Sequence, residues 1–178
     1  MGAPDVSQSL STMSKFLEGI KNQKNKSGKK IFSAVLEAML DLRKRLPPIY
    51  NFLPSHLLVD KDTHDVKIIV SQALFQKDSN ISNLERDDMV YKSPEELLGN
   101  GKSLTTPFWV LGCLLYEAKF NMYPFATHLK IQVTEMFIKF YPVMFPEDEE
   151  NDDEDFKDLI LHLLIKEPLQ RLGSDSFE

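Results

Sequence analysis

The sequence predicts a mainly α-helical protein with one small β-hairpin. Several segments place apolar residues at helical spacing, and the segment 107–120 is apolar on nearly all sides. Two short apolar runs flank a polar turn at 60–65, which is the pattern of a hairpin. The chain of 178 residues is long enough to bury one core. We therefore expect an N-terminal extension over 1–9 and a single domain over 10–178.

Four amphipathic helices are expected from the spacing of apolar residues. They cover residues 10–20, 31–46, 129–140 and 156–166. The polar stretch 22–30 is predicted to be a loop. Pro47 and Pro48 should end the second helix, because proline cannot continue the helical hydrogen bonding.

The central helix is expected over 107–120. A helix without a polar face is normally buried on all sides, so this segment should form the middle of the core. Pro107 suits its first turn, where no backbone N–H is required. The hairpin strands are expected at 57–59 and 66–70. Residues 71–92 show no sustained period and predict a long loop.

Composition and charge limit the functional classes. The formal net charge is −6, but eight of the 27 acidic residues lie in the run 147–155 and nine of the 21 basic residues lie in 15–45. The basic stretch lacks interleaved aromatic residues, so we expect no nucleic-acid partner. No apolar run reaches the roughly 18 residues that a membrane span needs. The one cysteine, Cys113, lies in an apolar run and suggests a buried thiol in a reducing, cytoplasmic setting.

Three motifs carry a resemblance to a known family. They are Ser-Pro-Glu at 93–95, Trp-Val-Leu-Gly at 109–112 and Arg-Leu-Gly at 171–173. Their order and spacing resemble the helical C-terminal lobe (C-lobe) of a eukaryotic protein kinase over about residues 10–178. The N-terminal lobe is expected to be absent, because no glycine-rich phosphate loop precedes these motifs. The resemblance implies a buried structural ion pair between Glu95 and Arg171.

The same resemblance places unexpected residues at the positions of kinase chemistry. Aligned on Pro54, Asn51 stands in place of the catalytic aspartate and His56 in place of the metal-binding asparagine. Val70 stands in place of the aspartate that binds magnesium. A neutral amide is a poor proton acceptor, and valine offers magnesium no oxygen. These degenerate catalytic positions predict no catalytic residue, no metal site and no cofactor, so the chain is expected not to be an enzyme.

The predicted function is therefore a non-catalytic interaction or scaffolding module that docks a partner protein or peptide. Its layout resembles pseudokinases and the kinase non-catalytic C-lobe domains, known as KIND domains. Two alternatives stay open: a regulator that imitates the C-lobe of an active kinase, and a fragment of an atypical kinase completed by another chain. The partner could be a basic peptide or an active kinase. The candidate partner-binding loop is acidic and consists of Glu147, Asp148, Glu149, Glu150, Asp152, Asp153, Glu154 and Asp155.

Overall fold

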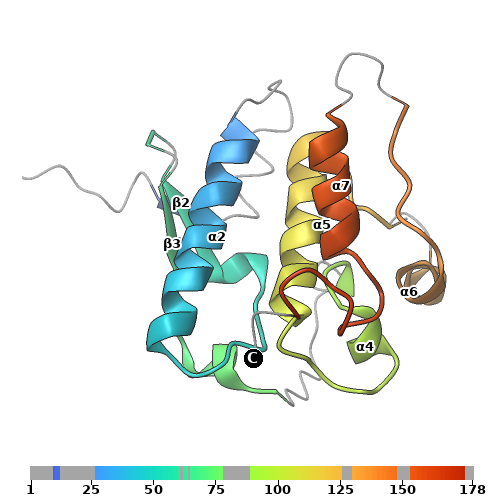
Figure 1. Cartoon of the computed structure of the whole chain (residues 1–178), viewed down its shortest axis with the longest axis horizontal. Coiled ribbons are helices and arrows are strands. Elements are labelled where there is room, and N and C mark those ends of the chain that lie inside the picture. The colour runs from blue at the N-terminus through green and yellow to red at the C-terminus, as the bar shows by residue number, and fades with distance from the viewer. Residues whose placement is uncertain are drawn as a thin grey trace, which may run out of the picture. The chain divides into compact units, whose positions relative to one another are not determined.

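The computed structural model describes residues 10–12, 27–60, 62–63, 65–77, 89–125, 130–147 and 153–174 (Figure 1). The chain divides into two compact units, which are described separately. The first contains residues 1–47 and 54–71, and the second contains residues 48–53 and 72–178. The predicted single domain over 10–178 stays a prediction, and the extension at 1–9 lies outside the described residues.

The long helix of the first unit is α2, Ser27–Arg45. It buries Val35 and Met39, which are four residues apart and therefore share one face. The predicted loop over 22–30 is wrong at its end, because the helix already begins at Ser27. The apolar spacing that starts at residue 31 marks the buried face, whereas the preceding turn is polar and needs no apolar residue to be helical. The helix ends before Pro47, as predicted.

The sheet of the first unit has three antiparallel strands in the order β1-β2-β3. The central strand β2, Leu57–Asp60, follows the short 3-10 helix η2, Pro54–His56, and pairs with β3, Val66–Ile68. This pairing confirms the predicted hairpin. Asp60 closes its turn, because one carboxylate oxygen accepts the backbone N–H groups of residues 62 and 63 at 2.9 Å each.

The other edge of β2 pairs with β1, Leu10–Thr12. The predicted helix over 10–20 is therefore wrong at 10–12, and residues 13–20 lie outside the described residues. The edge of β2 offers backbone N–H and C=O groups that need partners. Pairing with these groups overrides the helical preference that the apolar spacing suggested.

The second unit is built around α5, Thr106–Phe120, which the sequence predicted as the central helix. Every residue from Thr106 to Glu117 is buried. Helix α7, Glu154–Leu163, packs against α5 (Figure 1). Gly112 allows this close approach, since a Cβ atom there would lie 2.8 Å from Cδ2 of Leu164.

Shorter elements complete the second unit. The 3-10 helix η3 spans Gln72–Phe75, and α4 spans Pro94–Leu97. Helix α6, Ile131–Phe140, packs against α4. The predicted loop 71–92 thus contains a helical turn at η3, while its centre, 78–88, lies outside the described residues. The described part of the chain is mostly helical, and it contains no helix with both the length and the apolar character needed to cross a membrane.

Both the first and the last residue of α7 differ from the predicted ones. The helix begins two residues before the predicted 156, because Asp153 precedes it and its carboxylate accepts the backbone N–H of Phe156 at 3.2 Å. It ends at Leu163, three residues before the predicted 166. The apolar spacing continues to Ile165, but those last residues belong to the turn that leads to Arg171.

Candidate functional site

A buried polar cluster of the second unit is centred on Glu95 and Arg171. Two guanidinium nitrogens of Arg171 donate to the two carboxylate oxygens of Glu95, each at 2.8 Å. Arg171 is fully buried and Glu95 is 4% exposed. The structure thus contains the ion pair that the kinase resemblance implied, although 76 residues separate its partners in the sequence.

Backbone carbonyls take up the remaining donors of Arg171. Its Nε donates to the carbonyl oxygen of Ile165 at 3.0 Å, and its terminal nitrogens donate to those of Thr105 at 3.2 Å and Lys166 at 3.3 Å. Together with the two bonds to Glu95, these use all five N–H groups of the guanidinium. A buried charge that is paired and fully hydrogen-bonded avoids most of the desolvation penalty.

Two hydroxyl groups support the carboxylate of Glu95. Ser103 Oγ donates at 3.0 Å and Thr106 Oγ1 donates at 2.9 Å to the same carboxylate oxygen. Burial opposes ionisation of Glu95, but the hydrogen bonds and charge of Arg171, helped by Thr106, hold its pKa below the usual value. The carboxylate is therefore kept ionised, and α4 is fastened to the start of α5.

Trp109 lies next to the guanidinium group of Arg171 and the buried amino group of Lys166. The guanidinium carbon of Arg171 is 5.2 Å from the Trp109 ring centre, and the amino nitrogen of Lys166 is 5.0 Å from it. The same amino group lies 3.9 Å from the ring centre of Phe125, which is parallel to Trp109. Neither Lys166 Nζ nor Trp109 Nε1 has a hydrogen-bond partner among the residues that the structure describes, although both atoms are buried. Burial lowers the pKa of Lys166 to about 7.

Tyr91 ties the end of the 71–92 segment to the C-terminal turn of α5. Its hydroxyl donates to a carboxylate oxygen of Glu117 at 2.5 Å, and its ring meets Tyr123 edge-on. Burial, with the charge of Glu117, raises the pKa of Tyr91 far above its usual range, so the phenol stays a neutral donor. Cys113 is buried on the same helix, and burial raises the pKa of its thiol in the same way.

The predicted degenerate positions fall in different units. Asn51 is buried in the second unit, where its backbone N–H donates to the carbonyl oxygen of Leu74 at 3.0 Å. His56 and Val70 belong to the first unit; burial lowers the pKa of His56, and Val70 is 49% exposed. Their assigned role stays a prediction.

The residues at these positions do not fit a magnesium ion. Val70 carries no oxygen, and a histidine nitrogen is a poor ligand for this hard cation. No group of three or more His, Cys, Asp or Glu side chains within the described ranges could hold a metal. No catalytic step through a metal is therefore derived from these residues.

The predicted acidic loop is only partly described. Residues 148–152 lie outside the described residues, whereas Glu147, Asp153, Glu154 and Asp155 lie within them. Asp153 caps α7, and Glu154 lies 3.4 Å from Nζ of Lys157. Partner binding by this loop stays a prediction.

Sequence reasoning missed three parts of this cluster: the hydroxyl pair Ser103 and Thr106, the Tyr91–Glu117 bond and the buried amino group of Lys166. Glu117 gave one available signal, since it is an acid inside a helix predicted to be buried and so required a donor. Lys166 gave no comparable signal, because a lysine after an apolar helix is usually exposed.

The chain contains a region similar to protein kinases. Serine/threonine-protein kinase YPK1 of Saccharomyces cerevisiae is 31% identical over 148 residues, which cover 81% of this chain and 21% of that kinase. Serine/threonine-protein kinase gad8 of Schizosaccharomyces pombe is 41% identical over 47% of the chain and 14% of its own length. Serine/threonine-protein kinase WAG1 of Arabidopsis thaliana is 37% identical over 47% of the chain and 17% of its own length. No family model matches the chain.

This similarity establishes a kinase-like region, and the chain spans about a fifth of the length of YPK1. It also contradicts the prediction that the chain is not an enzyme, because several relatives that match it are named as serine/threonine-protein kinases. That prediction took the side chains of Asn51 and Val70 as decisive, although motif spacing alone had assigned their roles.

Proposed function

We propose that this chain forms the helical lobe of a serine/threonine-protein kinase and takes part in phosphoryl transfer to protein hydroxyl groups. The similarity to YPK1 over 81% of the chain carries the proposal. The buried Glu95–Arg171 pair supports it, because that pair is the structural feature that the kinase resemblance implied.

The contacts around α5 suit a lobe that presents a protein substrate. Three interactions fix the end of the 71–92 segment and α4: Tyr91 with Glu117, Ser93 with Glu96, and Glu95 with Arg171. A substrate-positioning loop needs such fixed ends, since orientation of the reactants supplies a large share of catalysis.

The proton acceptor and the metal ligands are proposed to come from elsewhere. The side chains of Asn51 and Val70 supply neither group. About four fifths of YPK1 has no counterpart in this chain, so the missing groups would be contributed by a further part of a longer protein or by another chain. Completion by another chain is the alternative that the sequence left open.

The test is a phosphoryl-transfer assay on the native protein. The protein that contains this chain is purified from its source and incubated with radiolabelled ATP, magnesium and a mixture of serine- and threonine-containing peptides. We expect label on serine or threonine, and we expect the label to disappear when the protein is depleted with an antibody against this chain. Absence of transfer by folded native protein contradicts the proposal.

The same experiment separates the other functions. The scaffolding role and the imitation of a kinase lobe remain predictions. A scaffold transfers no phosphate in this assay, and a regulator changes the rate of an added active kinase without labelling peptides itself.

A further inference from the structure

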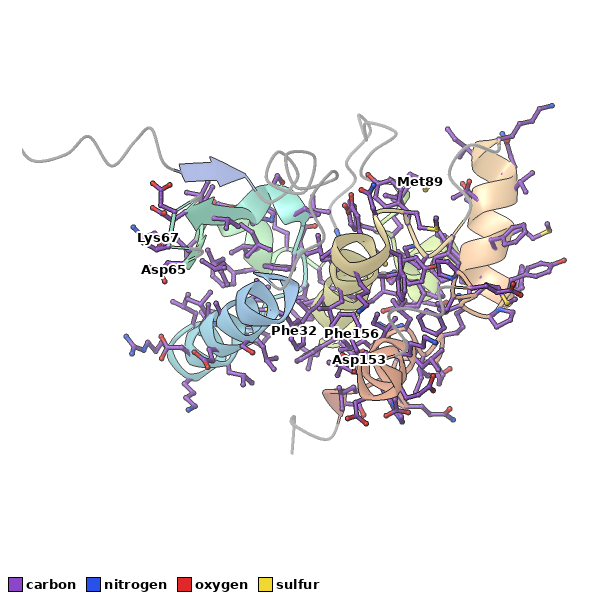
Figure 2. All side chains as sticks on the ribbon, turned by 90° about the horizontal axis from the view of Figure 1, so that it is seen from above. Phe32, Asp65, Lys67, Met89, Asp153 and Phe156 are labelled. Carbon is purple, nitrogen blue, oxygen red and sulfur yellow. The ribbon has the colours of Figure 1, made fainter. Side chains whose placement is uncertain are left out.

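Helix α6 carries more apolar surface than it buries. Only Thr134 and Ile138 are buried among its residues. Met136 and Phe140 lie four residues apart on the opposite face and are 40% and 67% exposed. Figure 2 shows α6, in pale orange, with side chains that point away from α5 and α7. A helix that is apolar on several faces is normally enclosed, so this face lacks a cover within the described residues.

The exposed apolar surface continues beyond the helix. Tyr141 is 45% exposed and Met144 is 71% exposed. The backbone at Met144 is held in place, because its carbonyl oxygen accepts the hydroxyl of Tyr116 at 2.6 Å. The next ring, Phe145, packs on Tyr116 with 5.7 Å between ring centres. The side chain of Met144 is therefore presented to solvent by a fixed backbone. Here the outer apolar patch means Met136, Phe140, Tyr141 and Met144.

Acidic side chains lie near the Met144 end of this patch, whereas at Phe140 the nearby charge is Lys139, whose Nζ is 6.0 Å from the ring centre. Nζ of Lys157 lies 6.0 Å from the ring centre of Phe145 and 3.4 Å from the carboxylate of Glu154, so the start of α7 lies beside Phe145. The side chain of Glu154 is 77% exposed, and Asp155 and Glu147 are exposed as well. These three acids are called the acidic rim. They belong to the run 147–155, in which every residue except Asn151 is acidic.

We infer that the outer apolar patch and the acidic rim together dock a segment of a partner protein that carries apolar and basic side chains. Apolar side chains of the partner would cover Met136, Phe140 and Met144, and its lysine or arginine residues would face the acidic rim. The negative charge disfavours an anionic lipid surface or a nucleic acid as the occupant. This binding goes beyond the proposed phosphoryl transfer and stands without it.

The test is calorimetric titration of the full chain with synthetic amphipathic peptides. The main probe is a helical peptide of leucine and lysine with the leucines on one face. Two matched peptides replace either the lysines by glutamate or the leucines by serine. We expect binding of the leucine–lysine peptide only, and we expect its affinity to fall as salt is raised. Equal binding of the leucine–glutamate peptide overturns the inference.

Variants locate the binding. Phe140→Ser and Met144→Ser should each weaken binding about tenfold, a loss of about 1.4 kcal/mol. A variant with Glu147→Gln, Glu154→Gln and Asp155→Asn should lose most of the salt dependence. The matched control is Leu169→Ser, because Leu169 is 82% exposed and follows Pro168, which accepts a hydrogen bond from Thr105 at the opposite end of α5.

Two outcomes contradict the inference. The first is unchanged binding by Phe140→Ser when circular dichroism shows that the variant is folded. The second is a concentration-dependent dimer in sedimentation that Phe140→Ser abolishes, since the patch would then serve a second copy of this chain.

Discussion

Helices α5 and α6 are both rich in apolar residues, but only α5 is enclosed. All residues of α5 from Thr106 to Glu117 are buried, whereas only Thr134 and Ile138 of α6 are buried. α5 is covered by α7 and by the ring of Phe125, and α6 rests on α4 by one face. The difference shows that apolar composition predicts a helix with surface to cover, but the neighbouring elements decide whether that surface is covered.

The largest contrast is expected between aromatic residues on the two helices. Trp109→Ala should reduce the free energy of unfolding by about 3–5 kcal/mol, because it opens a cavity among fully buried side chains. Phe140→Ala should change it by no more than about 0.5 kcal/mol, because that ring is mostly in solvent. Urea unfolding followed by circular dichroism measures both. Similar losses for the two variants would show that α6 is as well covered as α5.

Loss of the buried ion pair beside α5 should reduce the free energy of unfolding more than loss of the ion pair on α6. Arg171→Met should cost about 3–5 kcal/mol, because it strands the buried charge of Glu95. Glu95→Gln should cost a comparable amount, because it leaves the buried charge of Arg171 without its partner. The control on α6 is Glu135→Gln, which removes the 3.8 Å pair with Lys139 and should cost about 0.3–0.5 kcal/mol. The double variant of Glu95 and Arg171 should lose less than the sum of the single losses, and additivity would argue against their pairing.

Close packing of α5 predicts a smaller but measurable effect at Gly112. Gly112→Ala places a methyl group 2.8 Å from Leu164 and 2.9 Å from Leu163, and should cost about 1–3 kcal/mol through overpacking. Gln132→Ala on the exposed side of α6 should stay within about 0.5 kcal/mol. Thermal unfolding compares the two, and a neutral Gly112→Ala would mean that α7 can move away from α5 at little cost.

A further effect concerns the pH dependence of stability at Lys166. Burial lowers its pKa from 10.5 to about 7 in the folded chain, so the unfolded chain binds more protons between these values and stability should rise with pH across that window. Arg171 and Cys113 are the other titratable groups that act on this amino group. Lys166→Met should remove the rise, and Lys139→Met on α6 should keep it. A parallel pH profile for wild type and Lys166→Met would contradict the burial of the charge.

The sequence was most informative where a chemical requirement was local. The apolar segment 107–120 predicted the buried helix α5, and the polar turn 60–65 predicted the hairpin, because both depend on neighbouring residues alone. The Glu95–Arg171 pair came from motif spacing through the kinase resemblance. Strand β1 was missed because its partner, the edge of β2, lies about 50 residues away in the sequence.

The functional prediction failed for a related reason. Asn51 was assigned by counting from Pro54 and Val70 by its place after the strand at 66–69, and the chain was then expected not to be an enzyme. The kinase relatives contradict that step, since side chains at two aligned positions say nothing about groups that other parts of a protein contribute. The exposure of α6 was also beyond the sequence, because the spacing of residues 129–140 is the same for a covered and an uncovered helix.

Hydrogen exchange of the backbone amides in α5 and α6 tests the contrast between the two helices most directly. The full chain is measured alone and with the leucine–lysine peptide. We predict that α5 exchanges only through global unfolding in both samples, and that α6 exchanges faster and is slowed by the peptide. Equal protection of α5 and α6 in the free chain, with no change in α6 on adding the peptide, would contradict the account.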